Sequence, residues 1–440
     1  MQSQRLLSSL DLQKKLNLSQ SHVARLLKKI TDELLVIGQS RSTQYALKRE
    51  IPTIGFETLI YKVDHHGKAK KWGVLCGVWP KGYYFKSFVS DDHSQFFEDL
   101  PYFLEDMRPA GFLGKLIPRQ CKDLNVPRDI RVWTGDHCLQ YFYHYAWNLL
   151  GDLIVGDKAF ALHLKHAAQE THLYAKRSRS KVYPKLAEAL LEDGDVGSSA
   201  GGDQAKFLLS LKDTPRKHVL VKFSPPLNQK VGQRWGDLLI CEHIALQALR
   251  SSSVRPAESC LVFSDQRVFL EVERFDRHGD HGRSGVISLS SFCVEFLGEL
   301  NGTWTDLGEG LFKNKFISKT LLAQIQLLDI FGDLIANADR HAGNISFEWD
   351  NFKIKSLTPV YDMLPMLYRP LASEIIDQEF SPRLPGLIEK SIWEEAYDLA
   401  CEFWKDVAAH NKVSASFKKI AKENFEKLKS LKKLAGMLPD

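Results

Sequence analysis

A polar segment between a long apolar helix pattern and two short strand patterns constrains the fold more than any other part of the chain. Apolar residues recur at helical spacing over 321–335, which predicts a buried helix. The sequence NADRHAGN (337–344) ends that pattern, and two short strands are predicted at 345–349 and 352–357. Another acid, Asp362, follows them. A rigid helix, a polar loop, a hairpin and a second Asp match the plan of a kinase catalytic lobe.

The polar loop carries the residue types that phosphoryl transfer requires. A carboxylate must orient the attacking hydroxyl and accept its proton, and oxygen ligands must hold Mg²⁺. The five-residue spacing from Asp339 to Asn344 equals the spacing between base and metal ligand in protein-kinase catalytic loops. We predict Asp339 as the catalytic base and Asn344 and Asp362 as metal ligands. His341 joins the catalytic set, more as a brace for the loop than as a proton carrier. Taken alone, the string is also compatible with a capped polar turn.

A phosphate-binding region is predicted upstream of this loop. The segment DVGSSAGGDQAK (195–206) places Gly201 and Gly202 where backbone N–H groups can approach phosphate oxygens, although a flexible hairpin turn would have the same composition. The alternating strand 217–223 carries Lys222, which suits contact with the α- and β-phosphates or, alternatively, is an ordinary surface lysine. An acid on the next helix should pair with it, and both Asp237 and Glu242 are candidates.

The strand that ends in VERFDR (272–277) falls between the two candidate lobes, where a kinase hinge would bind the adenine edge. A strand ending in a charged turn is the alternative.

The positive charge of the chain is concentrated at its N-terminus. Residues 1–50 hold nine Lys/Arg and four Asp/Glu, whereas basic and acidic residues balance over the remainder. Residues 4–49 are predicted as three helices followed by a hairpin. Two short helices are expected within 10–30, and Ser19 is the expected N-cap of the second. The apolar residues expected to face inward from that helix are Val23, Leu26, Leu27 and Ile30. This resembles a winged helix-turn-helix with a recognition helix at 19–29 and a wing tip at 38–43. The predicted DNA-contacting residues are Gln20, Ser21, Arg25, Lys28 and Arg41. A helical cap for dimerisation or for covering another domain is the alternative.

The remaining features are less specific. Residues 70–89 are predicted as antiparallel strands joined at Lys81-Gly82, 96–165 as mainly helical, and 174–185 as an exposed connector. Helices dominate from about 286 to the end, and the last has an apolar face that includes Phe417 and Leu428. Seven scattered cysteines without a C-x-x-C motif favour a reducing cytoplasm over a disulfide framework. No membrane-spanning run is expected.

Taken in order, the Gly-rich loop, Lys222, VERFDR, NADRHAGN and YDMLP resemble the HipA family of toxin–antitoxin Ser/Thr kinases. The resemblance implies an α+β, two-lobe protein-kinase-like fold that depends on ATP and Mg²⁺. It implies that Lys222 contacts ATP, that Glu273 to Phe275 hold adenine, and that Asp339, Asn344 and Asp362 take the roles given above. The resemblance also implies autophosphorylation of a serine in the Gly-rich loop; aligned on Lys206, that serine is Ser199, with Ser198 adjacent. The loop departs from the commoner form of the family, which leaves that site open. Family targets include aminoacyl-tRNA synthetases.

The resemblance and the N-terminal pattern together predict four parts. These are a winged helix-turn-helix at 1–50, an N-terminal subdomain at 51–165, a kinase N-lobe at 166–276 and a helical C-lobe at 277–440. The N-terminal segment resembles the branch of the family with a fused DNA-binding domain, which predicts DNA as a partner and possible autoregulation, and a homodimer is left open. Two other functions remain: a DNA-binding regulator with an inactive kinase fold, and a small-molecule or lipid kinase, since DRHAGN is similar to the loop of phosphatidylinositol kinases.

Overall fold

The computed structural model describes residues 6–38, 42–167, 173–192, 204–298, 300–371, 374–376, 378–384 and 389–435. The chain divides into two compact units. The first contains residues 1–64, 68–109 and 117–169, and the second contains 65–67, 110–116 and 170–440. Both helices and strands occur in each unit, as expected for an α+β chain.

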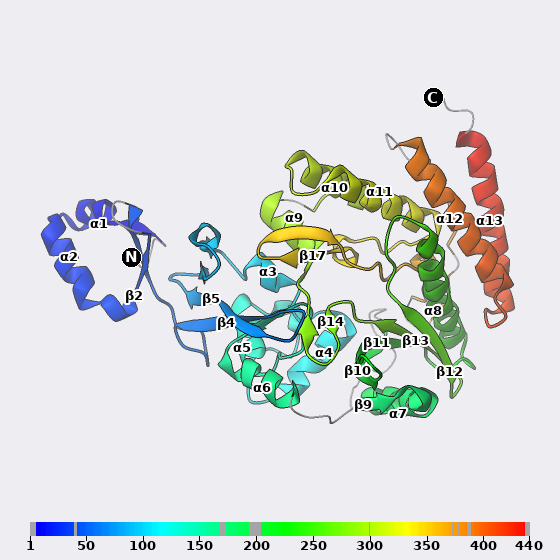
Figure 1. The fold of residues 1–440 in the computed structure, drawn as a ribbon, viewed down its shortest axis with the longest axis horizontal. Helices are drawn as coiled ribbons and strands as arrows, with labels where there is room; N and C mark the ends of the chain where they lie inside the picture. The colour runs from blue at the N-terminus through cyan, green and yellow to red at the C-terminus, as the bar shows by residue number, and fades with distance from the viewer. Residues whose placement is uncertain are drawn as a thin grey trace. The chain divides into compact units, whose positions relative to one another are not determined.

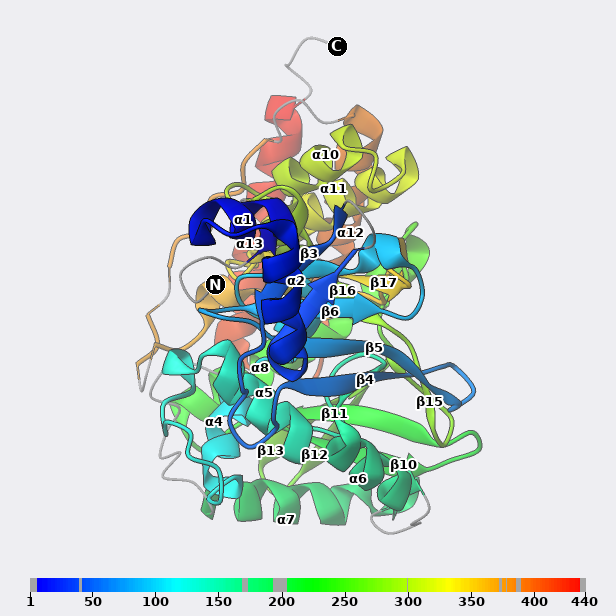
Figure 2. The ribbon, with the colours of Figure 1, turned by 90° about the vertical axis from the view of Figure 1, so that its left-hand side faces the viewer.

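The first unit begins with two short helices and a small antiparallel sheet (Figure 2). Leu12 and Val23 form its buried centre together with Leu7. Leu26 was expected there but is 43% exposed, because α2 turns Val23 and Leu27 toward the centre instead. The elements are β1 (Leu7–Ser8), α1 (Ser9–Leu16), α2 (Gln20–Lys29), β2 (Leu34–Ile37) and β3 (Gln44–Leu47), with a 3₁₀ turn at Thr31–Glu33.

Two details of the sequence prediction for this segment need correction. The first element is a strand rather than a helix, and only a 3₁₀ turn precedes β2, so two α-helices are present among described residues 6–38 and 42–49. Ser19 does occupy the N-cap of α2, but its Oγ contacts Ser21 Oγ at 3.0 Å and His22 Nδ1 at 2.9 Å instead of a backbone N–H.

The rest of the first unit is a five-stranded antiparallel sheet in the order β7-β6-β5-β4-β8, with helices around it. The predicted pairing on either side of Lys81-Gly82 is confirmed, since Gly77 lies opposite Tyr83 in the β5–β6 ladder. The elements are β4 (Glu57–Val63), β5 (Ala69–Gly77), β6 (Tyr83–Ser87), β7 (Gln95–Phe97), α3 (Tyr102–Glu105), α4 (Gly111–Gln120), α5 (Gly135–His144), β8 (Leu153–Val155) and α6 (Asp157–Ala167); residues 111–116 of α4 belong to the second unit.

The second unit begins with a five-stranded sheet in the order β12-β13-β11-β10-β9. Helix α7 covers part of it, and Tyr183 lies fully buried among Phe207, Phe223 and Phe269. The elements are β9 (Leu173–Ala175), α7 (Arg179–Glu192), β10 (Lys206–Lys212), β11 (Lys217–Phe223), α8 (Lys230–Ala248), β12 (Ser259–Ser264), β13 (Arg267–Glu273), β14 (Arg277–His278), β15 (Gly282–Arg283) and β16 (Val286–Ser288).

The prediction of an exposed connector at 174–185 is wrong. These residues form part of β9 and the first turns of α7. In α7 the basic residues of the segment alternate with apolar residues that are buried. Tyr183 Oη donates a hydrogen bond to Glu271 at 2.5 Å, and the Arg179 guanidinium pairs with the same carboxylate at 3.0 Å.

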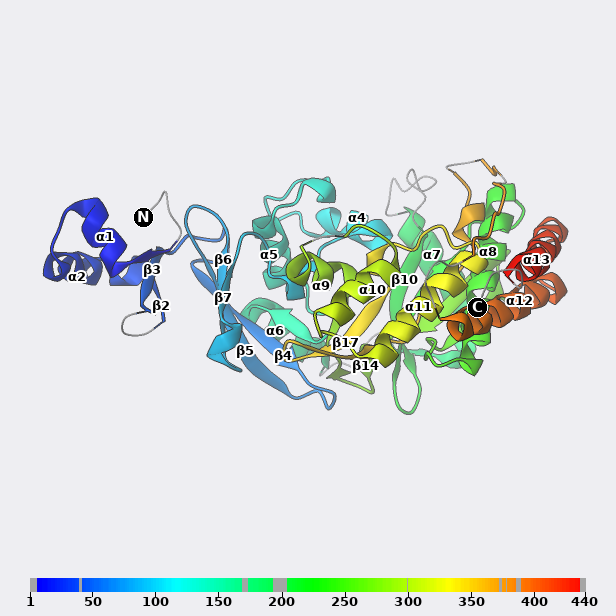
Figure 3. The same ribbon diagram turned by 90° about the horizontal axis from the view of Figure 1, so that it is seen from above.

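Helices dominate the remainder of the second unit, as predicted. In Figure 1, α12 lies beside α8 and α13 lies beside α12, and Figure 3 shows α10 next to α11. The apolar face of α13 is confirmed by the burial of Phe417, Ala421 and Leu428. The elements are α9 (Leu289–Phe296), α10 (Trp304–Lys313), α11 (Lys319–Leu334), β17 (Ser346–Asp350), β18 (Lys353–Leu357), α12 (Lys390–Ala409) and α13 (Ala415–Ala435), with 3₁₀ turns at Ala342–Asn344 and Met366–Tyr368.

No helix in the part of the chain that the structure describes is both long enough and apolar enough to cross a membrane.

Candidate active site

A polar cavity of about 290 Å³ in the second unit brings together most of the predicted chemistry. Lys222 comes from β11, whereas Asp339 and Asn344 come from the loop after α11 and Asp362 from the segment after β18. Residues separated by more than a hundred positions in the sequence therefore line one space. The lining residues are Gly111, Phe112, Gln204, Lys206, Lys222, Trp235, Glu242, Asp339, His341, Asn344, Asp362, Leu364, Met366 and Arg369.

A buried ion-pair network lies on one side of this cavity. Lys222 is 5% exposed, and its ammonium contacts both oxygens of the fully buried Glu242 carboxylate at 2.7 and 2.8 Å. The same ammonium donates to Asp362, whose backbone N–H donates to Glu242 Oε1 at 3.3 Å. The sequence left two acids open as the partner of Lys222, and the structure selects Glu242. Asp237 instead accepts hydrogen bonds from the Ser414 backbone N–H at 2.8 Å and the Ser414 hydroxyl at 2.6 Å.

Charge in this network is set by competition between burial and pairing. Burial alone would lower the pKa of Lys222, but the Asp362 and Glu242 carboxylates raise it, so the ammonium stays charged. Burial would raise the pKa of Asp362, and the nearby Lys222 and Lys206 ammonium groups reverse that shift, so the pKa is lowered. Asp362 therefore remains an anionic oxygen donor. Glu242 is buried more completely, and burial raises its pKa despite Lys222.

Two asparagines hold the loop at 337–344 through side-chain hydrogen bonds to backbone groups. Asn337 is fully buried; its Oδ1 accepts the Asp339 backbone N–H at 3.0 Å and its amide donates to the Asp362 carbonyl at 3.4 Å. Asn344 donates from its amide to the Asp339 carbonyl at 2.9 Å. These bonds fix the backbone on both sides of Asp339. Asp362 has a φ of 55°, a left-handed conformation that Asp tolerates better than most residues.

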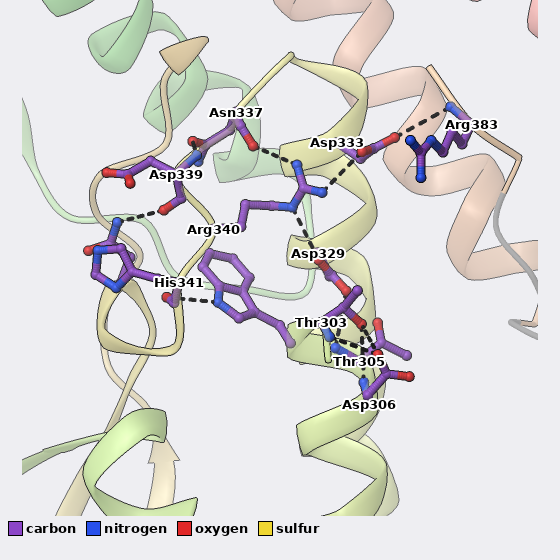
Figure 4. Close-up of polar contacts among 12 residues, drawn as sticks. Thr303, Thr305, Asp306, Asp329, Asp333, Asn337, Asp339, Arg340, His341 and Arg383 are labelled. Atoms are coloured by element: carbon purple, nitrogen blue, oxygen red, sulfur yellow. Dashed lines mark hydrogen bonds and ion pairs between the residues drawn. The ribbon is translucent and has the colours of Figure 1, made fainter. Parts of the chain in front are cut away.

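Arg340 has a structural role (Figure 4). Its guanidinium contacts Asp329 at 3.2 Å, Asp333 at 3.0 Å and the Asn337 carbonyl at 2.6 Å. A Cβ at Gly332 would lie 2.6 Å from Arg340 Cδ, so glycine there lets the arginine lie against α11. The loop is therefore tied to the helix that precedes it.

His341 braces the loop, as the sequence suggested. Its Nδ1 accepts the Gly343 backbone N–H at 3.1 Å, and its carbonyl accepts the Trp304 indole N–H at 3.0 Å. Both Asp339 and His341 also line a second cavity of about 340 Å³, together with Gly302, Thr303, Asp329, Asn337, Ala338 and Arg340. Asp339 thus lines both cavities.

Other predicted residues lie outside these cavities. Glu273 pairs with Lys217 at 2.5 Å, and the Phe275 ring lies on Tyr361 with ring centroids 5.7 Å apart; neither residue is among those that line the 290 Å³ cavity. The DNA-binding candidates Gln20, Ser21, Arg25 and Lys28 are exposed on α2. Gly201, Gly202, Ser198, Ser199 and Arg41 lie outside the described residues, so the phosphate-loop, autophosphorylation and wing predictions for them stay predictions.

The cavity suits a nucleotide and Mg²⁺. Gln204 Oε1 is buried without a hydrogen-bond partner among the described residues, so the cavity wall offers an unused acceptor. Asn344 and Asp362 supply the oxygen ligands that Mg²⁺ prefers. Lys206 lies opposite Lys222 in the β10–β11 ladder and adds a second cation.

Sequence reasoning missed several residues at the site, among them Gln204, Lys206, Trp235, Asn337 and Arg369. Of these, Asn337 carried a local signal, its position two residues before Asp339.

Comparisons with known proteins identify the family of the chain. Residues 55–164 match the middle domain of YjjJ-like toxins, and residues 198–431 match the HipA-like C-terminal domain. The chain is 38% identical to Toxin YjjJ of Escherichia coli (strain K12) over 437 residues, which cover 98% of this chain and 97% of that protein.

The fold resembles that of a chain in the Shewanella oneidensis MR-1 complex of HipA, HipB and operator DNA. The TM-score is 0.51 at 13% identity, and the match covers 84% of this chain and 95% of that one. The α+β, kinase-like fold class and the family resemblance are confirmed, whereas the four-part division and the winged helix-turn-helix stay predictions. The chain belongs to the HipA-like family of toxins.

Proposed function

We propose that the protein transfers the γ-phosphate of ATP to a Ser or Thr hydroxyl of a protein target, with Asp339 as the general base. The observation that carries this proposal is the position of Asp339 in both cavities. A base in phosphoryl transfer must reach the acceptor hydroxyl while that hydroxyl lies in line with the transferred phosphate, so the base is expected where the nucleotide space and the acceptor space meet. The 290 Å³ cavity then holds the nucleotide, and the 340 Å³ cavity receives the acceptor.

The reaction follows from the residues on the cavity walls. The acceptor oxygen forms a bond to the γ-phosphorus, the bond from that phosphorus to the β–γ bridging oxygen breaks, and ADP leaves with that oxygen. Asp339 takes the hydroxyl proton, while Lys222 and Lys206 hold phosphate oxygens. Asn344 and Asp362 would hold Mg²⁺, which neutralises charge on the phosphate oxygens when bound. Glu242 keeps Lys222 in place, and Asn337 fixes the backbone around the base.

A labelling experiment tests the reaction class. The protein is incubated with [γ-³²P]ATP, Mg²⁺ and a cell lysate, and the products are separated into protein and lipid fractions. We expect a labelled protein band in which phosphoserine or phosphothreonine is recovered after acid hydrolysis. Label in lipid or in a small molecule would support the alternative kinase class, and no label anywhere would support an inactive regulator.

We also propose that α2 contacts DNA. The exposed side chains of Gln20, Ser21, Arg25 and Lys28 lie along one short helix within the segment that carries the excess positive charge. The E. coli relative is named a toxin and the S. oneidensis complex contains operator DNA, which supports a regulatory contact with DNA. Binding to a duplex from the promoter of its own gene, measured against salt concentration, tests it.

A further inference from the structure

One cationic side chain in the wall of the 290 Å³ cavity has no role in the reaction described above. Arg369 is half-buried and lines the cavity with Lys206, Lys222 and Asp339. Lys222 is committed to Glu242 and Asp362. Among the residues that the structure describes, the Arg369 guanidinium has neither a carboxylate nor a carbonyl partner. The guanidinium can therefore bind an anion in this polar cavity without first breaking an ion pair.

The backbone at Arg369 is held firmly from several sides. The Arg369 N–H donates to the Met366 carbonyl at 3.2 Å, and the preceding Tyr368 carbonyl accepts from the buried Arg234 guanidinium at 3.0 Å. The Tyr368 hydroxyl and the Asn424 side chain are hydrogen-bonded in the core. The chain therefore fixes the origin of the side chain while leaving its charged end available, which is the arrangement expected of a preorganised ligand contact.

The neighbouring contacts indicate which end of a nucleotide Arg369 would meet. The segment from Asp362 to Arg369 follows the catalytic loop: Asn337 donates to the Asp362 carbonyl at 3.4 Å, and the Leu367 N–H donates to the Ala336 carbonyl at 3.1 Å. Ala336 lies three residues before Asp339. Arg369 thus follows closely after a backbone contact with the segment that leads to the base, and it lines the same cavity as Asp339, where the transferred phosphate would lie.

Resting on the proposed kinase activity, we infer that Arg369 binds the terminal phosphate of ATP and so distinguishes ATP from ADP. Its planar guanidinium can donate two hydrogen bonds to phosphate oxygens. It also supplies positive charge that the Lys222–Glu242–Asp362 network cannot, because that network already pairs one cation with two carboxylates. Loss of the γ-phosphate would free the contact and weaken nucleotide binding before product release.

The test compares two nucleotides on the full-length protein. Calorimetry with Mg²⁺ measures the affinities for ADP and for the non-hydrolysable analogue AMP-PNP in the parent and in Arg369→Met. We expect AMP-PNP to bind about 10- to 100-fold more weakly to the variant, while ADP affinity changes less than about twofold. Arg369→Lys should recover part of the loss, since it restores charge without the planar fork. Arg131→Met, which removes an arginine 85% exposed in the first unit, is the matched control and should match the parent.

Three results would overturn the inference. Equal weakening of both nucleotides in Arg369→Met would indicate a general loss of the cavity. Unchanged affinity for both, with a raised KM for a protein acceptor, would assign Arg369 to acidic groups on the target instead. No binding of either nucleotide by the parent would refute the ATP site itself and with it the proposed function, which separates the two failures.

Discussion

Removing the Lys222 ammonium should destabilise the second unit strongly, because this buried charge is paired with two carboxylates, of which that of Glu242 is fully buried. The Lys222 and Glu242 side chains are 6% and 0% exposed. Breaking a buried pair by removing one partner costs about 3–5 kcal/mol, since the other charge remains buried and uncompensated. We therefore expect Lys222→Met to lower the free energy of unfolding by that amount, measured by urea denaturation followed by tryptophan fluorescence and circular dichroism.

The pH dependence of this loss distinguishes electrostatics from packing. Without Lys222, Glu242 should take up a proton more readily, because its pKa is already raised by burial. An acid with a raised folded-state pKa binds protons preferentially in the folded state, so the variant gains stability relative to the parent as pH falls. The deficit of Lys222→Met should accordingly shrink as the pH falls toward the raised pKa of Glu242.

A second variant isolates the pair. Lys222→Met combined with Glu242→Leu replaces both charges by apolar side chains of similar size, and we expect it to recover at least about 2 kcal/mol of the single-variant loss. A Lys222→Met loss below about 1 kcal/mol, or a double variant whose loss equals the sum of the two single losses, would refute the account of the network.

Three further predictions concern the loop, a half-buried histidine and the N-terminal helix. Asn337→Leu leaves the Asp339 N–H unpaired, so it should lower the free energy of unfolding by about 1–3 kcal/mol, measured by denaturation. It should also lower kcat in a steady-state assay with little change in ATP affinity. A reduced ATP affinity with a normal kcat would contradict the positioning role. Burial lowers the pKa of His218 to about 4, whereas the pKa in the unfolded chain is about 6.5. The unfolded state therefore binds the proton first, and the protein loses stability as the pH falls from about 6.5 to about 4. His218→Asn should remove up to about 3 kcal/mol of that pH dependence, and an unchanged pH profile of unfolding would disprove it. Replacing Arg25 and Lys28 by Gln should reduce the salt dependence of DNA binding by about two phosphate contacts, and an unchanged slope would exclude α2 as the DNA-binding helix.

The sequence predicted those parts of the site that local pattern determines. The loop from Asp339 to Asn344 and the strand that carries Lys222 each have a signal within about ten residues, and the structure brings them to one cavity. The choice between Asp237 and Glu242 could not be made, because both lie on α8 and only packing decides which face of a helix meets β11. Arg369 was missed for a similar reason, since its importance comes from a cavity built by distant segments.

Long-range packing also explains the errors. The segment that begins α7 is rich in Lys and Arg and was predicted as a connector, yet Tyr183 buries against the sheet and its neighbour Arg179 finds Glu271, 92 residues later in the chain. In α2, helical spacing predicted several apolar residues on the buried face. In the structure Val23 and Leu27 pack into the small core, whereas Leu26 is exposed. Neither outcome has a signal in the local sequence.

Phosphoryl transfer by Asp339→Asn tests the central claim most directly. The parent, Asp339→Asn and the control Asp406→Asn, which changes an exposed acid on α12, are each incubated with [γ-³²P]ATP, Mg²⁺ and lysate protein, and nucleotide affinity is measured in parallel. We predict that Asp339→Asn binds ATP like the parent but transfers phosphate at least about 100-fold more slowly, because the side chain keeps its shape and loses its basicity. The control should match the parent. Transfer by Asp339→Asn at the parental rate would contradict the assignment of Asp339 as the base.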